Sequence, residues 1–98
     1  MVQVIDRLED AGGAECIKFR VYRSPRDPNR TLANWQHGVS EHGMASIGTS
    51  QLGVPVEIEF QRVVNEAAQY GVPFVWVDDP EGLFPPAKRP QIVPQGPA

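Results

Sequence analysis

The residues that most obviously suggest a binding site lie in the glycine-rich stretch GMASIGTSQLG, residues 43–53. Gly43, Gly48 and the hydroxyl of Ser50 have nearly the spacing of a phosphate-binding loop, in which backbone N–H groups cradle phosphate oxygens. Thr49, however, occupies the position of the lysine that reaches the phosphates in such a loop. A phosphate loop also needs a helix directly behind it, and the next helical pattern begins later. The spacing therefore predicts a turn or a bulged hairpin, and no nucleotide cofactor is assigned.

A second polar segment, HGVSEH at residues 37–42, carries side chains that can bind a metal ion or exchange protons. His37, Glu41 and His42 do not have the spacing of a helix-borne zinc pair, and the chain has no cysteine near them. On a strand, His37 and Glu41 share one face while His42 points to the other. We predict a solvated surface loop here, with a metal site as the open alternative.

Asp78, Asp79 and Glu81 follow the apolar run VPFVWV, residues 72–77, beyond the carboxyl end of a predicted strand. Open α/β sheets bind ligands at such ends, and carboxylates commonly hold Mg²⁺. The sequence Asp-Pro-Glu-Gly is also typical of a turn, in which aspartate accepts hydrogen bonds from nearby backbone and glycine tolerates a positive φ. We therefore predict a turn and leave the magnesium alternative open.

The segment from residue 18 to residue 30 is basic, although the chain as a whole has a net charge of −3. Its positive side chains, set against Asp27 alone, are Lys18, Arg20, Arg23, Arg26 and Arg30. Tyr22 and Trp35 could stack on a base beside them, so the pattern admits a phosphate or nucleic-acid contact. The alternative is the solvent-facing side of a strand, shielded by long charged side chains.

One ordered set of residues suggests an enzyme. Tyr22, Arg23 and Ser24 are followed by Gly-Thr-Ser at 48–50 and by Glu-x-Glu at 57–59. In this order they resemble the three motifs of ADP-ribosyltransferases, in which the arginine holds the dinucleotide, the hydroxyl strand shapes the site and the last glutamate orients the transfer. The chain departs from that family because its glutamates follow soon after the hydroxyl motif, on a predicted helix, and because the family's domain is longer. The resemblance implies an alternative site for a phosphate-bearing small molecule at Arg23, Ser50, Glu57 and Glu59.

Alternating hydrophobicity predicts the strands that position these residues. From Ala14 to Arg23 apolar and polar residues alternate, which is typical of a half-buried strand. One face carries Ile17, Phe19 and Val21, and the other carries Lys18, Arg20 and Tyr22. The segment 2–5 favours an edge strand, with a short helix that includes Leu8 as the alternative. The segment 32–53 predicts one or two irregular strands.

The clearest element is an amphipathic helix at about residues 55–70, with Pro55 in its first turn and Gly71 at its end. The run 72–77 behind it lacks alternation and predicts a central strand covered on both faces. We therefore expect one α+β domain at residues 1–84: a small, mainly antiparallel sheet of four or five strands, packed on one face by this helix. Residues 85–98 are proline-rich and predict an extended or disordered tail.

Composition restricts the class of protein. A chain of 98 residues buries one small core, so self-association would add stability that a domain of this size lacks. The single Cys16 excludes an internal disulfide, the first residues lack the pattern of a signal peptide, and no apolar run is long enough for a membrane span. We expect a cytoplasmic protein without membrane contact.

The predicted function is that of a non-enzymatic binding or accessory module. One helix covers one face of a sheet and leaves the other for a partner, and Tyr, Trp and Arg are enriched at binding hot spots. The predicted partner is a second copy of the chain or another protein, and the predicted binding residues are Arg20, Tyr22, Arg23, Trp35 and Trp76. No catalytic residue, metal or cofactor is assigned. The alternatives are the small-molecule site above and a single-stranded nucleic-acid binder, which the acidic helix disfavours.

Overall fold

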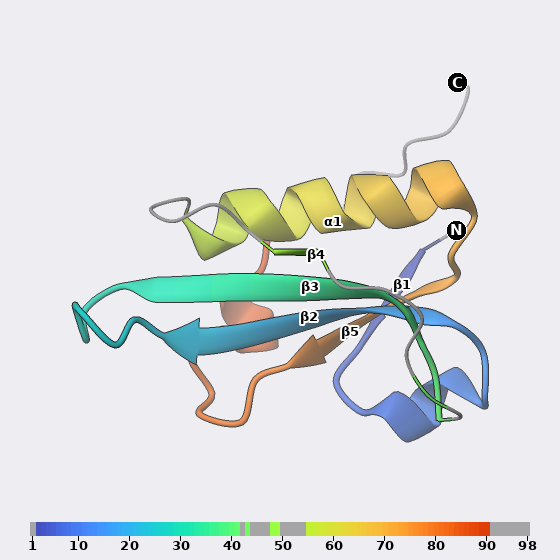
Figure 1. Ribbon diagram of the computed structural model, residues 1–98, viewed down its shortest axis with the longest axis horizontal. Coiled ribbons are helices and arrows are strands. Elements are labelled where there is room, and N and C mark those ends of the chain that lie inside the picture. Colours follow the sequence, from blue (N-terminus) through green and yellow to red (C-terminus); the bar gives the residue numbers. More distant parts are fainter. Residues whose placement is uncertain (1, 42, 44–47, 50–54, 91–98) are drawn as a thin grey trace.

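A five-stranded sheet with one α-helix across one face makes up the computed structural model of the protein, which describes residues 2–41, 43, 48–49 and 55–90 (Figure 1). Along the chain the elements are β1 (Gln3–Ile5), the 3₁₀ helix η1 (Leu8–Ala11), β2 (Cys16–Arg23), β3 (Thr31–Val39), β4 (Gly48–Thr49), α1 (Val56–Tyr70), β5 (Phe74–Asp78) and the 3₁₀ helix η2 (Pro86–Lys88). The strands lie in the order β1-β5-β2-β3-β4. The predicted α+β class is confirmed.

The sheet is mixed, whereas the sequence predicts a mainly antiparallel one. β5 pairs in parallel with both β1 and β2, while the β2–β3 and β3–β4 pairs are antiparallel. A short loop joins β2 to β3 and reverses the chain, but β5 follows α1, and a crossing helix brings the next strand back in the same direction. Alternation along one strand carries no information about the direction of its neighbours. For this reason the prediction is wrong on this point.

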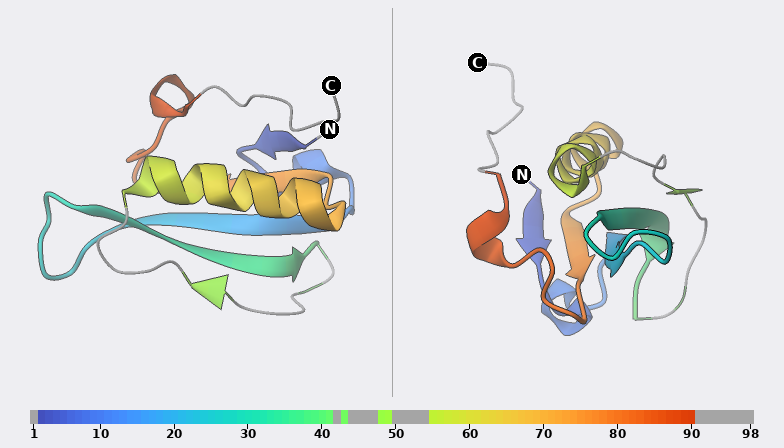
Figure 2. Two further views of the ribbon diagram at one scale, coloured as in Figure 1. Left: turned by 90° about the horizontal axis from the view of Figure 1, so that it is seen from above. Right: turned by 90° about the vertical axis from the view of Figure 1, so that its left-hand side faces the viewer.

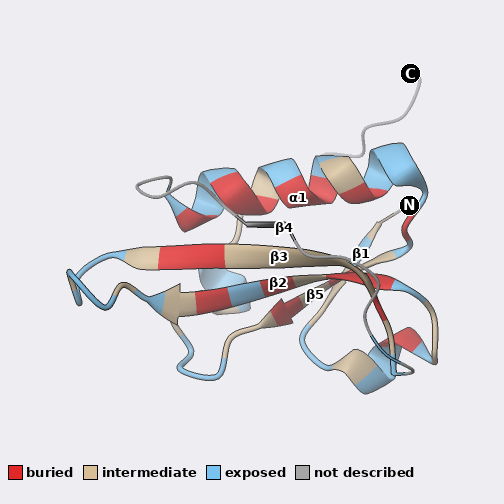
Figure 3. Cartoon of the chain, in the orientation of Figure 1, coloured by how far each residue is buried: buried red, intermediate tan, exposed pale blue. Residues whose placement is uncertain are grey.

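α1 covers the sheet with an apolar stripe at the predicted spacing, and its opposite side is exposed (Figure 3). The helix ends at Gly71, whose φ of 70° lies in the left-handed region that glycine adopts without steric cost. Beneath the helix, the rings of Phe19, Phe60 and Phe84 pack against one another with centroids between 5.3 and 6.2 Å apart. These three rings, from β2, α1 and the segment after β5, form the centre of the core.

A β-bulge in β3 decides which of its side chains face α1. Lys18 pairs with Gln36, and the next pair is Cys16 with Val39. Between these pairs β3 has two residues where β2 has one, so β3 carries one extra residue. Gly38 lies within the bulge at a φ of 66°. His37 follows Trp35 by ordinary alternation and faces α1. The bulge moves the next alternate residue, Val39, to the opposite side of the sheet with Cys16, where both are buried.

β5 is an internal strand, as predicted, but its two faces are covered unequally. Val75 and Val77 face α1 and are buried, whereas Phe74 and Trp76 point to the other face and are half-buried. Figure 2 shows the reason: α1 lies along one face of the sheet, while the short η1 lies on the other face and near one end. One face of the sheet therefore keeps partly exposed aromatic side chains.

The first residues of the predicted tail pack against the domain. Pro86–Lys88 form η2, and the side chain of Arg89, 10% exposed, lies over the Phe84 ring and pairs with Asp6. The remainder of the predicted tail, 91–98, lies outside the described residues. Arg89 therefore joins the first part of the predicted tail to the N-terminal segment through Asp6.

Candidate functional site

Three of the five predicted binding residues lie together on the sheet face opposite α1. Arg20 and Tyr22 point there from β2 and Trp76 points there from β5, because these positions alternate with buried ones. Strand pairing adds neighbours from three strands to the same face. The set is termed the open sheet face and consists of Lys18, Arg20, Tyr22, Asn34, Trp76 and Asp78.

The open sheet face combines aromatic rings with charges of both signs. The Lys18 ammonium lies 5.0 Å from the centroid of the Trp76 ring and 3.6 Å from Oδ2 of Asp78. Tyr22 Oη donates a hydrogen bond to Asn34 Oδ1 over 3.4 Å. Arg20 is exposed, and its guanidinium has no ion-pair partner among the residues that the structure describes. Binding surfaces commonly combine these features: a cation over an aromatic ring and an exposed guanidinium beside it.

η1 limits the open sheet face at the end where β2 begins (Figure 1). Cys16, the first residue of β2, is fully buried there. Burial, and then the negative charge of Glu15, raises the pKa of the Cys16 thiol above its ordinary value of 9.0. A buried and protonated thiol is a poor nucleophile, so Cys16 serves as a small core side chain.

Arg23 and Trp35, the other two predicted binding residues, lie away from the open sheet face. Arg23 alternates with Tyr22 along β2 and therefore lies on the side of the sheet that α1 covers. Its Nη1 donates to the Pro28 carbonyl over 3.0 Å, and its Nε lies 3.8 Å from Glu81 Oε1. Trp35 is paired with Phe19 and faces α1. A shift of one position along a strand moves a side chain to the other face. The structure therefore separates Arg23 and Trp35 from the other three.

A second cluster of chemically capable side chains lies between β3 and α1. It is termed the α1/β3 seam and consists of Trp35 and His37 from β3 and Glu59, Arg62, Glu66 and Tyr70 from α1. The two strand residues are two positions apart and the four helix residues are three or four apart, so each set shares one side of its element. These spacings are the signal in the sequence that could have indicated the seam residues within each element. What the sequence does not show is that this strand lies beneath this flank of the helix.

Glu59 is the most unusual residue of the seam, because its side chain is only 1% exposed. Its Oε1 accepts a hydrogen bond from Trp35 Nε1 over 3.1 Å. Its Oε2 has no hydrogen-bond partner within the described part of the chain, and its ion-pair partner is the half-exposed Arg62, whose Nη1 lies 3.4 Å away. Buried carboxylate oxygens without a donor are rare and costly, so this one calls for a functional explanation.

His37 lies between two aromatic rings further along the seam. The centroids of Trp35 and Tyr70 are 5.0 and 6.0 Å from that of His37, both with edge-on geometry. Its Nε2 lies 3.7 Å from Glu66 Oε1, a contact that becomes an ion pair when the imidazole is protonated. Glu41, the metal candidate paired with His37 in the sequence, is exposed beyond β3, and His42 lies outside the described residues. Within the described ranges, no three metal-binding side chains come together.

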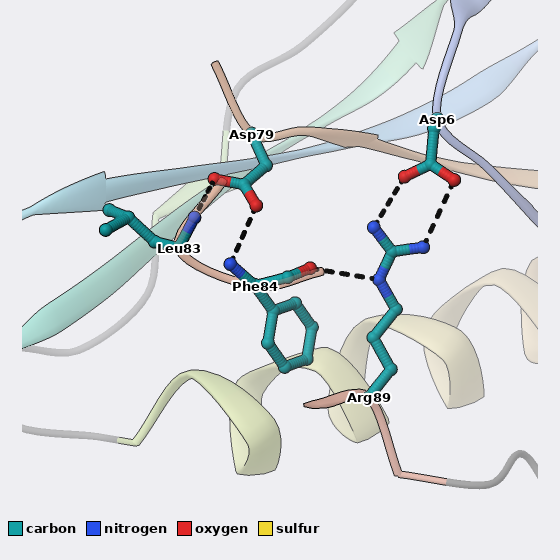
Figure 4. Close-up of polar contacts among 5 residues, drawn as sticks. All are labelled: Asp6, Asp79, Leu83, Phe84 and Arg89. Atoms are coloured by element: carbon teal, nitrogen blue, oxygen red, sulfur yellow. Dashed lines mark hydrogen bonds and ion pairs between the residues drawn. The ribbon is translucent and has the colours of Figure 1, made fainter. Parts of the chain in front are cut away.

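The acidic turn after β5 uses one carboxylate to hold the backbone (Figure 4). Oδ1 and Oδ2 of Asp79 accept hydrogen bonds from the N–H groups of Leu83 and Phe84 over 2.8 and 2.7 Å. Arg89 then donates to the Phe84 carbonyl over 3.2 Å and pairs with Asp6 through two guanidinium nitrogens. These contacts support the interpretation of Asp79 as a turn residue that seats Phe84 in the core.

The residues of the ADP-ribosyltransferase-like alternative do not converge in the described structure. Glu57 is exposed while Glu59 is buried, because residues two apart on a helix point in different directions. Arg23 is engaged by Pro28 and Glu81 and makes no contact with Glu59. Ser50 lies outside the described residues.

No protein-family model, curated protein or solved structure matches the chain. Nor does the described part of the chain contain a helix with the length and apolar character needed to cross a membrane. A functional assignment therefore depends on the geometry of the open sheet face and of the α1/β3 seam.

Proposed function

We propose that this protein is a non-enzymatic binding module that self-associates through its open sheet face. The observation that carries the proposal is the cation–π pair of Lys18 and Trp76, set beside Tyr22 and the exposed Arg20 on the face that α1 does not cover. Aromatic and arginine side chains are the residues most enriched in the energetic centre of interfaces. A partner that covers them would remove their apolar area from water, at about 25 cal/mol per Å².

A second copy of the chain is the partner that suits this face. Two cations, Lys18 and Arg20, lie next to one anion, Asp78, across the β2–β5 pair. Under a two-fold axis a patch of this kind meets itself, so the cations of one copy can lie opposite Asp78 of the other. A single-stranded nucleic acid suits it less well, because Trp35, one of the two rings that would stack on bases, faces α1.

Sedimentation equilibrium of the wild type and two charge-reversal variants tests the proposal. We expect a reversible dimer whose dissociation constant rises at least about tenfold in Arg20→Glu, which corresponds to about 1.4 kcal/mol. Arg26→Glu is the matched control, since Arg26 is an exposed arginine in the loop between β2 and β3 and the change in net charge is identical. A wild type that stays monomeric at millimolar concentration would contradict the proposal. So would equal weakening by both variants, because it would reflect net charge alone.

A further inference from the structure

We infer that the α1/β3 seam is a binding site for a guanidinium group, separate from the open sheet face and on the opposite side of the sheet. Glu59 supplies the buried anion, Trp35 contacts it directly, and His37 and Tyr70 continue the aromatic surface further along the seam. Arg62 and Glu66 line the same flank of α1.

The charge of the seam favours a cation. Glu59 and Glu66 are about two helical turns apart on one flank of α1, and Arg62 lies between them. The two carboxylates and the one guanidinium of these helix residues together carry one net negative charge. A ligand cation would be attracted by this net negative charge.

Oε2 of Glu59 is the proposed contact for this cation, and because the atom is buried, a ligand reaches it by displacing the half-exposed Arg62 side chain. A carboxylate can accept about four hydrogen bonds, and within the described residues Glu59 accepts one, from Trp35. Since Trp35 fixes one oxygen, the carboxylate is held in place before any ligand arrives. A charged N–H donor at Oε2 would offset the desolvation of the buried carboxylate, which the present contacts leave incomplete.

Arg62 indicates which kind of cation the seam accommodates. Its Nη1 approaches Oε2 to 3.4 Å without forming a hydrogen bond, and its side chain remains 52% exposed. Because Arg62 lies three residues along the same helix, its tether limits the geometry with which it can meet Glu59. A guanidinium from solvent has no such tether and can align two parallel N–H groups with the carboxylate. A primary ammonium lacks that fork.

The group can come from a free small molecule or from an arginine side chain of a peptide, and the probes separate these sources. ¹H–¹⁵N spectra of the wild type are titrated with methylguanidinium, with an end-capped Gly-Arg-Gly peptide and with methylammonium. The indole N–H signal of Trp35, assigned by its presence in Trp76→Phe, reports the contact because this group donates to Glu59. We expect a saturable shift of the Trp35 indole with one or both guanidinium probes, and binding of methylammonium that is at least about fivefold weaker.

Two variants separate a binding site from a structural ion pair. Glu59→Gln keeps an oxygen acceptor for Trp35 but removes the charge, so guanidinium binding should weaken more than about tenfold. Arg62→Gln removes the resident competitor, so binding should become several-fold tighter. A purely structural pair predicts no such gain, and the Arg62→Gln result stays decisive if Glu59→Gln does not fold. Glu57→Gln, an exposed glutamate on the same helix, is the control and should bind like the wild type.

Binding of methylguanidinium, with or without binding of the peptide, assigns the site to the free group. Binding of the peptide alone assigns it to an arginine side chain, and each of these results supports the inference. A Trp35 indole signal that does not saturate with either probe would overturn it. Undiminished binding by Glu59→Gln, or no gain in Arg62→Gln, would do the same.

Discussion

Asp79 is a single residue whose carboxylate holds two backbone N–H groups, those of Leu83 and Phe84. Asp79→Ala leaves both donors without this acceptor, so we expect a loss of about 1–3 kcal/mol in the free energy of unfolding. Urea denaturation measures the loss. The control is Glu81→Gln, in the same turn, whose 53% exposed side chain has one long ion contact and should change stability by less than about 0.5 kcal/mol. Equal effects of the two changes would refute this role of Asp79.

Cys16 is a second residue with a measurable effect, here on the pH dependence of stability. Burial and Glu15 raise the pKa of the folded thiol, whereas the unfolded thiol titrates near 9.0. The folded state therefore holds the proton more tightly, and this contribution to stability is complete below pH 9.0 and lost as pH rises through the raised pKa. We expect the stability difference between the wild type and Cys16→Ala to shrink from about pH 8 to about pH 10, measured by urea unfolding. A constant difference across this range would count against the burial of the thiol.

At the scale of elements, the segment from β5 to η2 closes the core. Phe84 is fully buried against Phe19 and Phe60, although it lies in an irregular stretch between prolines and glycine. Phe84→Ala should cost about 3–5 kcal/mol, a large share of the 5–15 kcal/mol that small domains possess. Chemical denaturation measures this, with the half-buried Leu83→Ala as the milder comparison. If both variants lose the same stability, the segment does not close the core in this way.

The elements also show what a single sequence can and cannot predict. The helix predicted at 55–70 is Val56–Tyr70, and the predicted alternation of Ile17, Phe19 and Val21 is present in β2, because periodicity and end signals are local. The parallel pairing of β5 depends on the path of the chain across the sheet, which no local pattern encodes. The contacts of Arg89 depend equally on a partner far away along the chain, Asp6.

In the candidate sites too, the sequence predicts what depends on local patterns and does not predict what depends on contacts between distant segments. Arg20, Tyr22 and Trp76 reach one face because alternation within β2 and β5 places them there. Trp35 lies on the other face because the register of β3 against β2 pairs it with Phe19, which faces α1. The bulge at Gly38 then decides where the next part of β3 points, and a glycine alone does not reveal a bulge.

At the scale of the whole molecule, one helix protects one side of the sheet, and self-association is proposed to protect the other. The midpoint of thermal unfolding should therefore rise with protein concentration, by roughly 4–8 °C for each kcal/mol that association contributes. Tyr22→Ala should remove much of this dependence. Tyr70→Ala, which truncates a 65% exposed aromatic residue of α1, should retain it. A midpoint independent of concentration in the wild type would contradict the expectation.

The most direct test of the open sheet face as an interface is a dilution series of ¹H–¹⁵N spectra of the wild-type protein. The backbone amide signals of Lys18, Arg20 and Trp76 are predicted to shift together with concentration, while those on the exposed side of α1 stay unchanged. Signals that do not move with concentration, or that move only in α1, would contradict the account.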